Sequence, residues 1–383
     1  MAIYLDYNST TPIDLRVLDY MVDIYKNVPG NPDSRTHIYG EKAREKVEIA
    51  RNQVAHLLGI TSDEVFFTSG ATESNNIAIR GLYDYAKKTE KNHIITTTIE
   101  HKSILETVKY LEREGFEVDY INPDSTGRIN SDEVISKIRE NTLIVSIMHV
   151  NNETGIIQPV HEIGEYLQDK DVYFHVDATQ SCGKLVDELR NIKYDMLSFS
   201  AHKLRGPQGV GVLVLKKKSY KRLPVKNVMY GGQQENGIRP GTVPVALVAG
   251  CGLACEIAEN EFTEINEINK SIKKTILDLL KSYDIDYVIN GNEEYNVNNT
   301  LNICFKDVSS EALMLCTKDF ISISNGSACT SKSYAPSYVL KSMNIPTDDI
   351  ESSVRISWGA DIKVDDLMES LKKALEILCQ IKG

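Results

Sequence analysis

The regular alternation of short β-rich runs with helical stretches constrains the fold of this chain most strongly. The β-rich runs are EVFFTS, HIITTT, FEVDYI, TLIVSIMHV, VYFHVDA, MLSFSA and GVGVLVL, and polar helical stretches lie between most of them. In GEKAREKVEIARNQVAHLLG, apolar residues recur at helical spacing from Ala43 to Leu58, and Gly59 is placed to end the helix. This alternation predicts an α/β fold, in which βαβ units form a mostly parallel sheet that helices cover.

The composition changes near residue 260 and predicts a second, smaller domain. ENEFTEINEINKSIKKTILDLLKS has the pattern of a charged amphipathic helix, and the strand-like runs YVIN, TLNICF and SVRISWG follow it. We therefore predict a large domain over residues 14–257 and a small α+β domain formed by residues 1–13 and 258–383.

Charge and hydropathy exclude several functions. The net charge of −11 argues against broad binding of nucleic acid, so no direct nucleic-acid partner is expected. No apolar run approaches the roughly eighteen residues that a membrane span needs, so no membrane partner is expected either. The start, MAIYLDYNSTTP, lacks the basic flank and apolar core of a signal peptide, and the cytoplasm is the expected compartment.

The cysteines fall into different environments. Seven scattered cysteines, an odd number, do not suggest a disulfide framework, and no metal site is expected. Cys251 and Cys255 lie in VALVAGCGLACEIA, which has the pattern of a buried helix, so core packing is the expectation for both. Cys329 instead lies among Gly, Ser, Asn, Thr and Pro in ISNGSACTSKSYAPSY, a composition typical of a mobile surface loop.

Two neighbouring strand ends carry the strongest chemical signal. HVDATQ and SFSAHK each read as a strand that ends in small or polar residues, and they supply Asp177, Gln180, Ser200, His202 and Lys203. In open α/β sheets, ligands bind beyond the carboxyl ends of the strands. A partly buried lysine there could form a Schiff base, and a facing carboxylate suits a pyridinium nitrogen. Pyridoxal 5′-phosphate (PLP) needs both groups.

Other motifs supply groups that would complete such a site. In TSGATESNN, Gly70 permits close approach of the backbone, and Ala71 and Thr72 open a helix whose free N–H groups suit a phosphate. His101 follows a strand in TIEHKS, where an imidazole could stack on a cofactor or move protons, although a histidine at a strand end is often only hydrogen-bonded. Asn152, in HVNNETG, could donate to a phenolate oxygen or a substrate carboxylate.

Two further residues are candidates for binding anions. Thr242 lies in the Gly-rich loop GGQQENGIRPGTVP and is a candidate phosphate ligand. Arg355 lies inside the apolar strand SVRISWG, where a buried guanidinium needs an anion. That anion is either a substrate carboxylate or the partner in a structural ion pair.

In this order, these motifs resemble the NifS/IscS-like cysteine desulfurases, class-V PLP-dependent enzymes of fold type I. The resemblance runs from YLDYNSTTP through GNPDSRTH and the motifs above to NGSACTS and VRISWG, essentially the whole chain. NGSACTS resembles the subgroup with a long cysteine loop. The run HKLRGPQG departs from the usual pattern at Arg205 and Gln208, and Asn8, Asp33 and Cys182 also differ from the residues expected there. Cys182 is less favoured than Cys329 as a catalytic thiol.

The resemblance implies a role for each candidate residue. Lys203 would hold PLP covalently, Asp177 would keep the ring nitrogen protonated, and His101 would stack on the ring and assist proton transfer. Gln180 and Asn152 would flank the phenolic oxygen. The residues implied at the phosphate are Ala71, Thr72, Ser200, His202 and, from the neighbouring subunit of an obligate homodimer, Thr242.

The resemblance also implies a reaction. Arg355, with Asn152, would bind the carboxylate of L-cysteine, and Cys329 as a thiolate would take the substrate sulfur as a persulfide, releasing alanine. A sulfur-acceptor protein would then receive the sulfur for iron–sulfur cluster assembly, tRNA thiolation or DNA phosphorothioation. Alternatives are an aminotransferase or selenocysteine lyase of the same fold, and a non-catalytic platform for sulfur trafficking.

Overall fold

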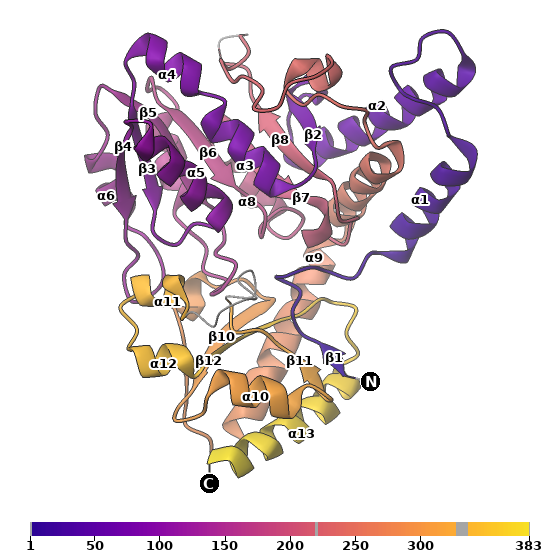
Figure 1. Cartoon of the computed structure of the whole chain (residues 1–383). Helices are drawn as coiled ribbons and strands as arrows, with labels where there is room; N and C mark the ends of the chain where they lie inside the picture. The colour runs from indigo at the N-terminus through magenta and orange to yellow at the C-terminus, as the bar shows by residue number, and fades with distance from the viewer. Residues whose placement is uncertain (1, 219–220, 327–335, 383) are drawn as a thin grey trace.

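A seven-stranded sheet forms the centre of the larger of two lobes in the computed structural model, which describes residues 2–218, 221–326 and 336–382 (Figure 1). The strand order is β2-β8-β7-β6-β5-β3-β4. The strands are β2 (Val65–Thr68), β3 (His93–Thr97), β4 (Glu117–Ile121), β5 (Thr142–Met148), β6 (Tyr173–Asp177), β7 (Met196–Ser200) and β8 (Gly211–Leu215). Each falls within one of the seven runs, so the predicted α/β fold is confirmed.

The sheet is parallel except at one strand. β8 pairs in antiparallel fashion with both β2 and β7, and the pairings among β3, β4, β5, β6 and β7 are parallel. Because β2 and β7 both run opposite to β8, they share one direction. The carboxyl ends of six strands therefore meet at one edge of the sheet.

Neighbouring side chains along each strand point to opposite faces of the sheet and pack in two different apolar clusters. Both faces are therefore apolar, and helices cover both of them. Phe66 packs in the cluster on one face and Phe67 in the cluster on the other. The first face is covered by α3 (Ala71–Arg80), α4 (Tyr83–Thr89) and α5 (Lys102–Arg113). The second cluster includes side chains of α1 (Leu15–Asn27), α2 (Ile38–Leu58), α6 (Ser131–Ser136), α7 (Val160–Leu167) and α8 (Val186–Asn191). Gly59 ends α2 with φ +65°, as predicted.

The smaller lobe contains both described ends of the chain. Its antiparallel sheet has the order β12-β10-β9, with β9 (Tyr287–Ile289), β10 (Thr300–Phe305) and β12 (Ser353–Ser357). The N-terminal strand β1 (Ile3–Tyr4) pairs in parallel with β11 (Ile321–Ser322), so in Figure 1 the indigo start of the chain lies beside orange elements. The helices of this lobe are α10 (Ser310–Thr317), α11 (Tyr338–Ser342), α12 (Thr347–Glu351) and α13 (Val364–Lys382).

One helix, α9 (Val245–Lys281), belongs to both lobes (Figure 1). Cys251 and Cys255 in its first half are buried in the core of the large lobe, which confirms their predicted packing. Ile272 and Ile276 in its second half are buried in the core of the small lobe. The change in composition near residue 260 thus occurs inside a continuous helix, and the predicted domain boundaries stay a prediction.

Short 3-10 helices complete the described elements: η1 (Ser62–Glu64), η2 (Ala201–Lys203), η3 (Gln234–Gly237) and η4 (Glu293–Tyr295). In the part of the chain that the structure describes, no helix combines the length and apolar character needed to cross a membrane.

Candidate active site

A cavity of about 300 Å³ lies at the edge of the sheet where the six carboxyl ends meet. Ten of the twelve predicted site residues line it: Ala71, Thr72, His101, Asn152, Asp177, Gln180, Ser200, His202, Lys203 and Arg355. Thr242 is exposed and does not line the cavity. Cys329 lies outside the described residues. Asn8, Ser9, Met148, Val150, Thr179 and Gly326 also line the cavity and were not predicted.

The strand ends explain why distant residues meet here. Asp177 ends β6 and Ser200 ends β7, and these strands are parallel neighbours. Lys203 follows in η2, one turn beyond the end of β7. His101 and Asn152 follow β3 and β5 in the same way. The arrangement is the one expected for ligands in open α/β sheets.

The Lys203 amine is held by the backbone of the N-terminal segment. Its Nζ donates to the carbonyl oxygen of Asn8 at 2.5 Å and to that of Ser9 at 2.6 Å. The same segment is fixed to η2, because the Thr11 N–H donates to the His202 carbonyl oxygen at 3.0 Å. The amine is therefore placed at a defined point on the cavity wall.

Asp177 is buried, and both of its carboxylate oxygens accept hydrogen bonds. Oδ2 accepts from Asn75 Nδ2 at 2.8 Å, and Oδ1 accepts from the backbone N–H of Thr179 at 2.9 Å. A buried carboxylate on the cavity wall can in turn bind a protonated ring nitrogen.

The cavity wall also contains the imidazole of His101. His101 caps the N-terminus of α5, with Nδ1 accepting from the backbone N–H of Ser103 at 3.2 Å. Burial lowers the pKa of His101, the charge of Lys203 lowers it further, and the carboxylate of Asp177 opposes both effects. His101 is therefore neutral near pH 7.

The N-terminus of α3 forms a polar end of the cavity. The Ala71 N–H donates to Ser200 Oγ at 2.7 Å, and Thr72 lies next to it on the helix. A Cβ at Gly211 would lie 2.6 Å from the Gly70 Cα, so only glycine at 211 lets β8 pass this turn. His202 is hydrogen-bonded to Thr10, and burial, followed by the charge of Lys203, lowers its pKa to about 4. N–H groups at a helix N-terminus suit an anion such as phosphate.

The structure shows one of the two alternatives stated for Arg355, the structural ion pair. Its Nη2 forms an ion pair with Asp6 at 2.5 Å, and its Nη1 donates to the Asn152 carbonyl oxygen at 2.9 Å. Its Nε is buried without a hydrogen-bond partner among the described residues, and the same holds for Asn152 Oδ1. Arg355 is therefore the partner in a structural ion pair, and its binding of a substrate carboxylate stays a prediction.

Cys182 does not share the features of this site. It is completely buried within the core of the large lobe and does not line the cavity. Burial raises the pKa of its thiol well above the ordinary value, which disfavours the reactive thiolate. These features favour a structural role for Cys182.

Two site residues that the prediction missed carried a weak signal. Asn75 lies four residues after Ala71 in the quoted motif TSGATESNN, so helical spacing places both on one face of α3. Asn8 departs from the expected sequence, and its side chain donates to Thr300 Oγ1 at 3.0 Å and to the Asn152 carbonyl oxygen at 3.2 Å. The departure itself could have drawn attention to position 8.

The fold and the cavity define a class of α/β protein with an amine, a carboxylate and a helix N-terminus around one ligand site. Residues 3–369 match the family model of the class-V aminotransferases. The chain is 42% identical over 381 residues to "Cysteine desulfurase IscS" of Photorhabdus laumondii, covering 98% of this chain and 93% of the relative. The protein of the same name from Escherichia coli is also 42% identical, over 380 residues, with the same shares covered.

Solved structures agree with this result. A "NifS-like protein" superposes with a TM-score of 0.91 at 35% identity, covering 99% of this chain and 100% of that one. DndA from Streptomyces lividans superposes with a TM-score of 0.81 at 40% identity, covering 92% of this chain and 98% of that one. The chain therefore belongs to the class-V aminotransferase family, and within it to the group of the IscS cysteine desulfurases.

Proposed function

We propose that this protein is a PLP-dependent cysteine desulfurase that converts L-cysteine to L-alanine and holds the sulfur for transfer to another protein. One observation carries the proposal. The Lys203 amine, the Asp177 carboxylate and the N-terminus of α3 face one cavity at the carboxyl edge of the sheet. These are the three groups that a carbonyl carbon, a pyridinium nitrogen and a phosphate require.

The residues present fit PLP. The cavity volume of about 300 Å³ lies at the lower end of the range for small-molecule sites. Its buried Asn152 Oδ1 and Arg355 Nε have no partner among the described residues, which leaves polar atoms for a ligand. When bound, PLP would supply an electron sink that weakens the Cβ–S bond of the substrate.

The chain's own residues then have distinct tasks. Lys203 would anchor the cofactor covalently, and Asp177 would keep its ring nitrogen protonated. Gln180 and Asn152 would bind the phenolic oxygen, and His101 would stack on the ring. Ala71, Thr72, Ser200 and His202 would hold the phosphate, and Arg355 and Asn152 would orient the substrate carboxylate.

Cys329 receives the sulfur in this proposal. Its thiolate attacks the substrate sulfur, so the S–S bond of a persulfide forms as the Cβ–S bond of cysteine breaks. The thiol proton and the electron pair of the broken bond end in the methyl group of alanine, and no external oxidant is needed. The acceptor protein, the pathway it serves among the three named above, and the cytoplasmic location stay predictions.

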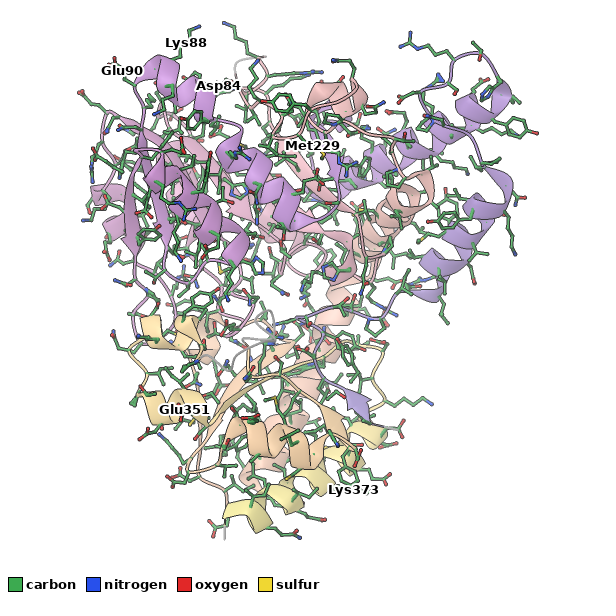
Figure 2. All side chains as sticks on the ribbon, viewed as in Figure 1. Asp84, Lys88, Glu90, Met229, Glu351 and Lys373 are labelled. Carbon is green, nitrogen blue, oxygen red and sulfur yellow. The ribbon has the colours of Figure 1, made fainter. Side chains whose placement is uncertain are left out.

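A second copy of the chain would complete the phosphate site. Thr242 is exposed and outside the cavity of its own chain, which suits a residue that reaches a neighbouring subunit. Tyr230, 90% exposed, and Met229, 44% exposed, precede it in the same loop, and Figure 2 labels Met229 in the upper part of the large lobe. Exposed apolar side chains in the loop that leads to Thr242 support an interface between copies of the chain.

Absorbance and product analysis test the proposal. The purified protein incubated with PLP should gain an absorption band at the edge of the visible range, and Lys203→Ala should lose it. Cysteine should yield alanine, with sulfide released in the presence of a reductant, and Cys329→Ala should stop this sulfur release while keeping the band. A protein that stays colourless would refute the proposal. A coloured protein that transaminates, or that acts on selenocysteine alone, would support one of the alternatives instead.

A further inference from the structure

A continuous chain of hydrogen bonds joins Asp177 to His101 through two residues that do not line the cavity. Asn75 Nδ2 lies 2.8 Å from Asp177 Oδ2 and 2.9 Å from Ser103 Oγ. Ser103 Oγ in turn lies 2.9 Å from His101 Nδ1, which also accepts from the Ser103 backbone N–H at 3.2 Å. Asn75 is completely buried and Ser103 is 8% exposed. The chain of bonds is thus shielded from exchange with bulk water.

Counting hydrogens along this chain fixes the direction of every bond. An ionised carboxylate only accepts, so the nitrogen of the Asn75 amide, and not its oxygen, faces Asp177. The same nitrogen carries a second hydrogen, which it donates to Ser103 Oγ. The Ser103 hydroxyl then has one hydrogen left to donate, and His101 Nδ1 lies within reach of it.

The backbone N–H of Ser103 gives an independent result for the histidine. A backbone N–H can only donate, so His101 Nδ1 must accept and carries no proton in the neutral ring. The ring proton therefore resides on Nε2. Since Nδ1 is bound to Ser103, Nε2 is the ring nitrogen left for whatever occupies the cavity.

We propose that Asn75 and Ser103 are positioning residues that hold His101 in the tautomer with its proton on Nε2, so that the ring presents a hydrogen-bond donor to the cavity. In this state His101 donates to an acceptor atom of the bound substrate and does not take a proton at Nε2. The proposal deepens the proposed function, on which the task of His101 rests, but the tautomer is a property of the protein alone.

The charged groups around His101 are compatible with a neutral ring. Asp177 faces it from the end of β6, Lys203 from η2 and Lys102 from the start of α5. Burial and the two lysines lower the pKa of His101, and only Asp177 raises it. The ring is therefore neutral and can adopt the tautomer that its neighbours select.

The test uses the full chain without cofactor, so it does not depend on activity. Diethyl pyrocarbonate reacts with neutral imidazole, and peptide mass spectrometry after labelling at a series of pH values gives the midpoint for His101. The exposed His161 is labelled in the same digest and serves as an internal reference. The ¹⁵N chemical shifts of the histidine rings, assigned with His101→Gln, report which nitrogen carries the proton.

Two substitutions perturb the network in a defined way. In Asn75→Asp, the carboxylate accepts the Ser103 hydroxyl hydrogen, so Ser103 Oγ turns its acceptor side to His101 and favours a proton on Nδ1. The new carboxyl group lies within hydrogen-bond distance of Asp177, so the two groups share one proton and no negative charge is added. The exchange of a donor for an acceptor at His101 Nδ1 should by itself raise the His101 midpoint. Ser103→Ala should raise it by a smaller amount, because Nδ1 loses one donor, and Ser103→Thr should restore the wild-type midpoint.

The outcomes separate this proposal from the proposed function. Wild-type shifts that place the proton on Nδ1, or midpoints that stay unchanged in Asn75→Asp and Ser103→Ala, would overturn it. If circular dichroism shows that Asn75→Asp does not fold, the His101 midpoints of Ser103→Ala and Ser103→Thr provide the test. A chain that fails to bind PLP but shows the expected tautomer would overturn only the proposed function.

Discussion

Glu100, which directly precedes His101, is a buried carboxyl group whose replacement by glutamine should stabilise the protein in a pH-dependent way. Its side chain is inaccessible, and Oε1 accepts from Thr97 Oγ1 at 2.8 Å and from the Met148 N–H at 3.0 Å. Oε2 is buried without a partner among the described residues. Burial, and secondarily the charge of Asp177, raises the pKa of Glu100 from its ordinary 4.5 to about 8.

The sign and size of the effect follow from the protons that each state binds. Between its ordinary pKa of 4.5 and about 8, Glu100 keeps its proton in the folded chain and loses it in the unfolded chain. The folded state binds more protons over this window, so the free energy of unfolding falls as the pH rises through it. One pH unit corresponds to about 1.4 kcal/mol, so the loss is about 2 kcal/mol at pH ~6 and approaches about 5 kcal/mol above pH ~8.

Glu100→Gln avoids this loss because an amide does not ionise. Its carbonyl oxygen can accept from the same two donors, Thr97 Oγ1 and the Met148 N–H, so both hydrogen bonds are kept. The stability advantage of the variant over the wild type should therefore grow by about 3 kcal/mol between pH ~6 and pH ~9.

Urea unfolding of the cofactor-free chain, followed by circular dichroism at about pH 6, 7, 8 and 9, measures this advantage. Glu106→Gln, an exposed position on α5, is the matched control and should show no such trend. An advantage of Glu100→Gln that changes by less than about 0.5 kcal/mol across the series, or that shrinks as the pH rises, would refute the reasoning.

Two further substitutions probe the walls of the cavity. Gly326 has φ +84°, and a Cβ there would lie 2.7 Å from Glu153 Oε2. Gly326→Ala should lower the free energy of unfolding by about 1–3 kcal/mol more than Gly115→Ala, because Gly115 (φ +91°) has open space at its Cβ position. Equal losses of thermal stability would contradict the clash. Lys184 Nζ donates to Gln180 Oε1 at 3.3 Å, and burial, with the charge of Lys203, lowers the pKa of Lys184 to about 7. Lys184→Met should weaken PLP binding by up to about ten-fold because the Gln180 amide then keeps only its bond to the Asn8 carbonyl oxygen, and an unchanged affinity in an absorbance titration would count against this role.

The sheet could be predicted strand by strand because most of its strands are buried on both faces. Such strands are nearly continuous apolar runs, and Thr142–Met148 is buried at every position. The antiparallel direction of β8 could not be predicted, because its sequence is as apolar as that of its parallel neighbours. The continuity of α9 was also hidden, since its two halves pack in different cores and so differ in composition.

Much of the site could be predicted for a different physical reason. Parallel strands that end at one edge of a sheet bring their following residues together, so Asp177, Ser200 and His101 converge without any knowledge of side-chain packing. The ion pair of Arg355 with Asp6 could not be found in this way, because it joins a residue of β12 to one in the N-terminal segment, 349 positions apart in the sequence. Only the three-dimensional arrangement places such groups together.

Asn8 differs from the residue that the family resemblance predicts, and the structure shows that it connects the two lobes. Its carbonyl oxygen accepts from Lys203 Nζ at 2.5 Å and from Gln180 Nε2 at 2.9 Å, both in the large lobe. Its backbone N–H and side chain are bound to Ser357 Oγ and Thr300 Oγ1, both in strands of the small lobe. The amine that would hold the cofactor is thus bound to a carbonyl group whose position the small lobe fixes. If the two lobes move relative to one another, either the hydrogen bonds of Asn8 to the small lobe break, or the Asn8 carbonyl oxygen moves away from Lys203 Nζ with the small lobe. The arrangement of the lobes and the environment of this amine are therefore physically coupled.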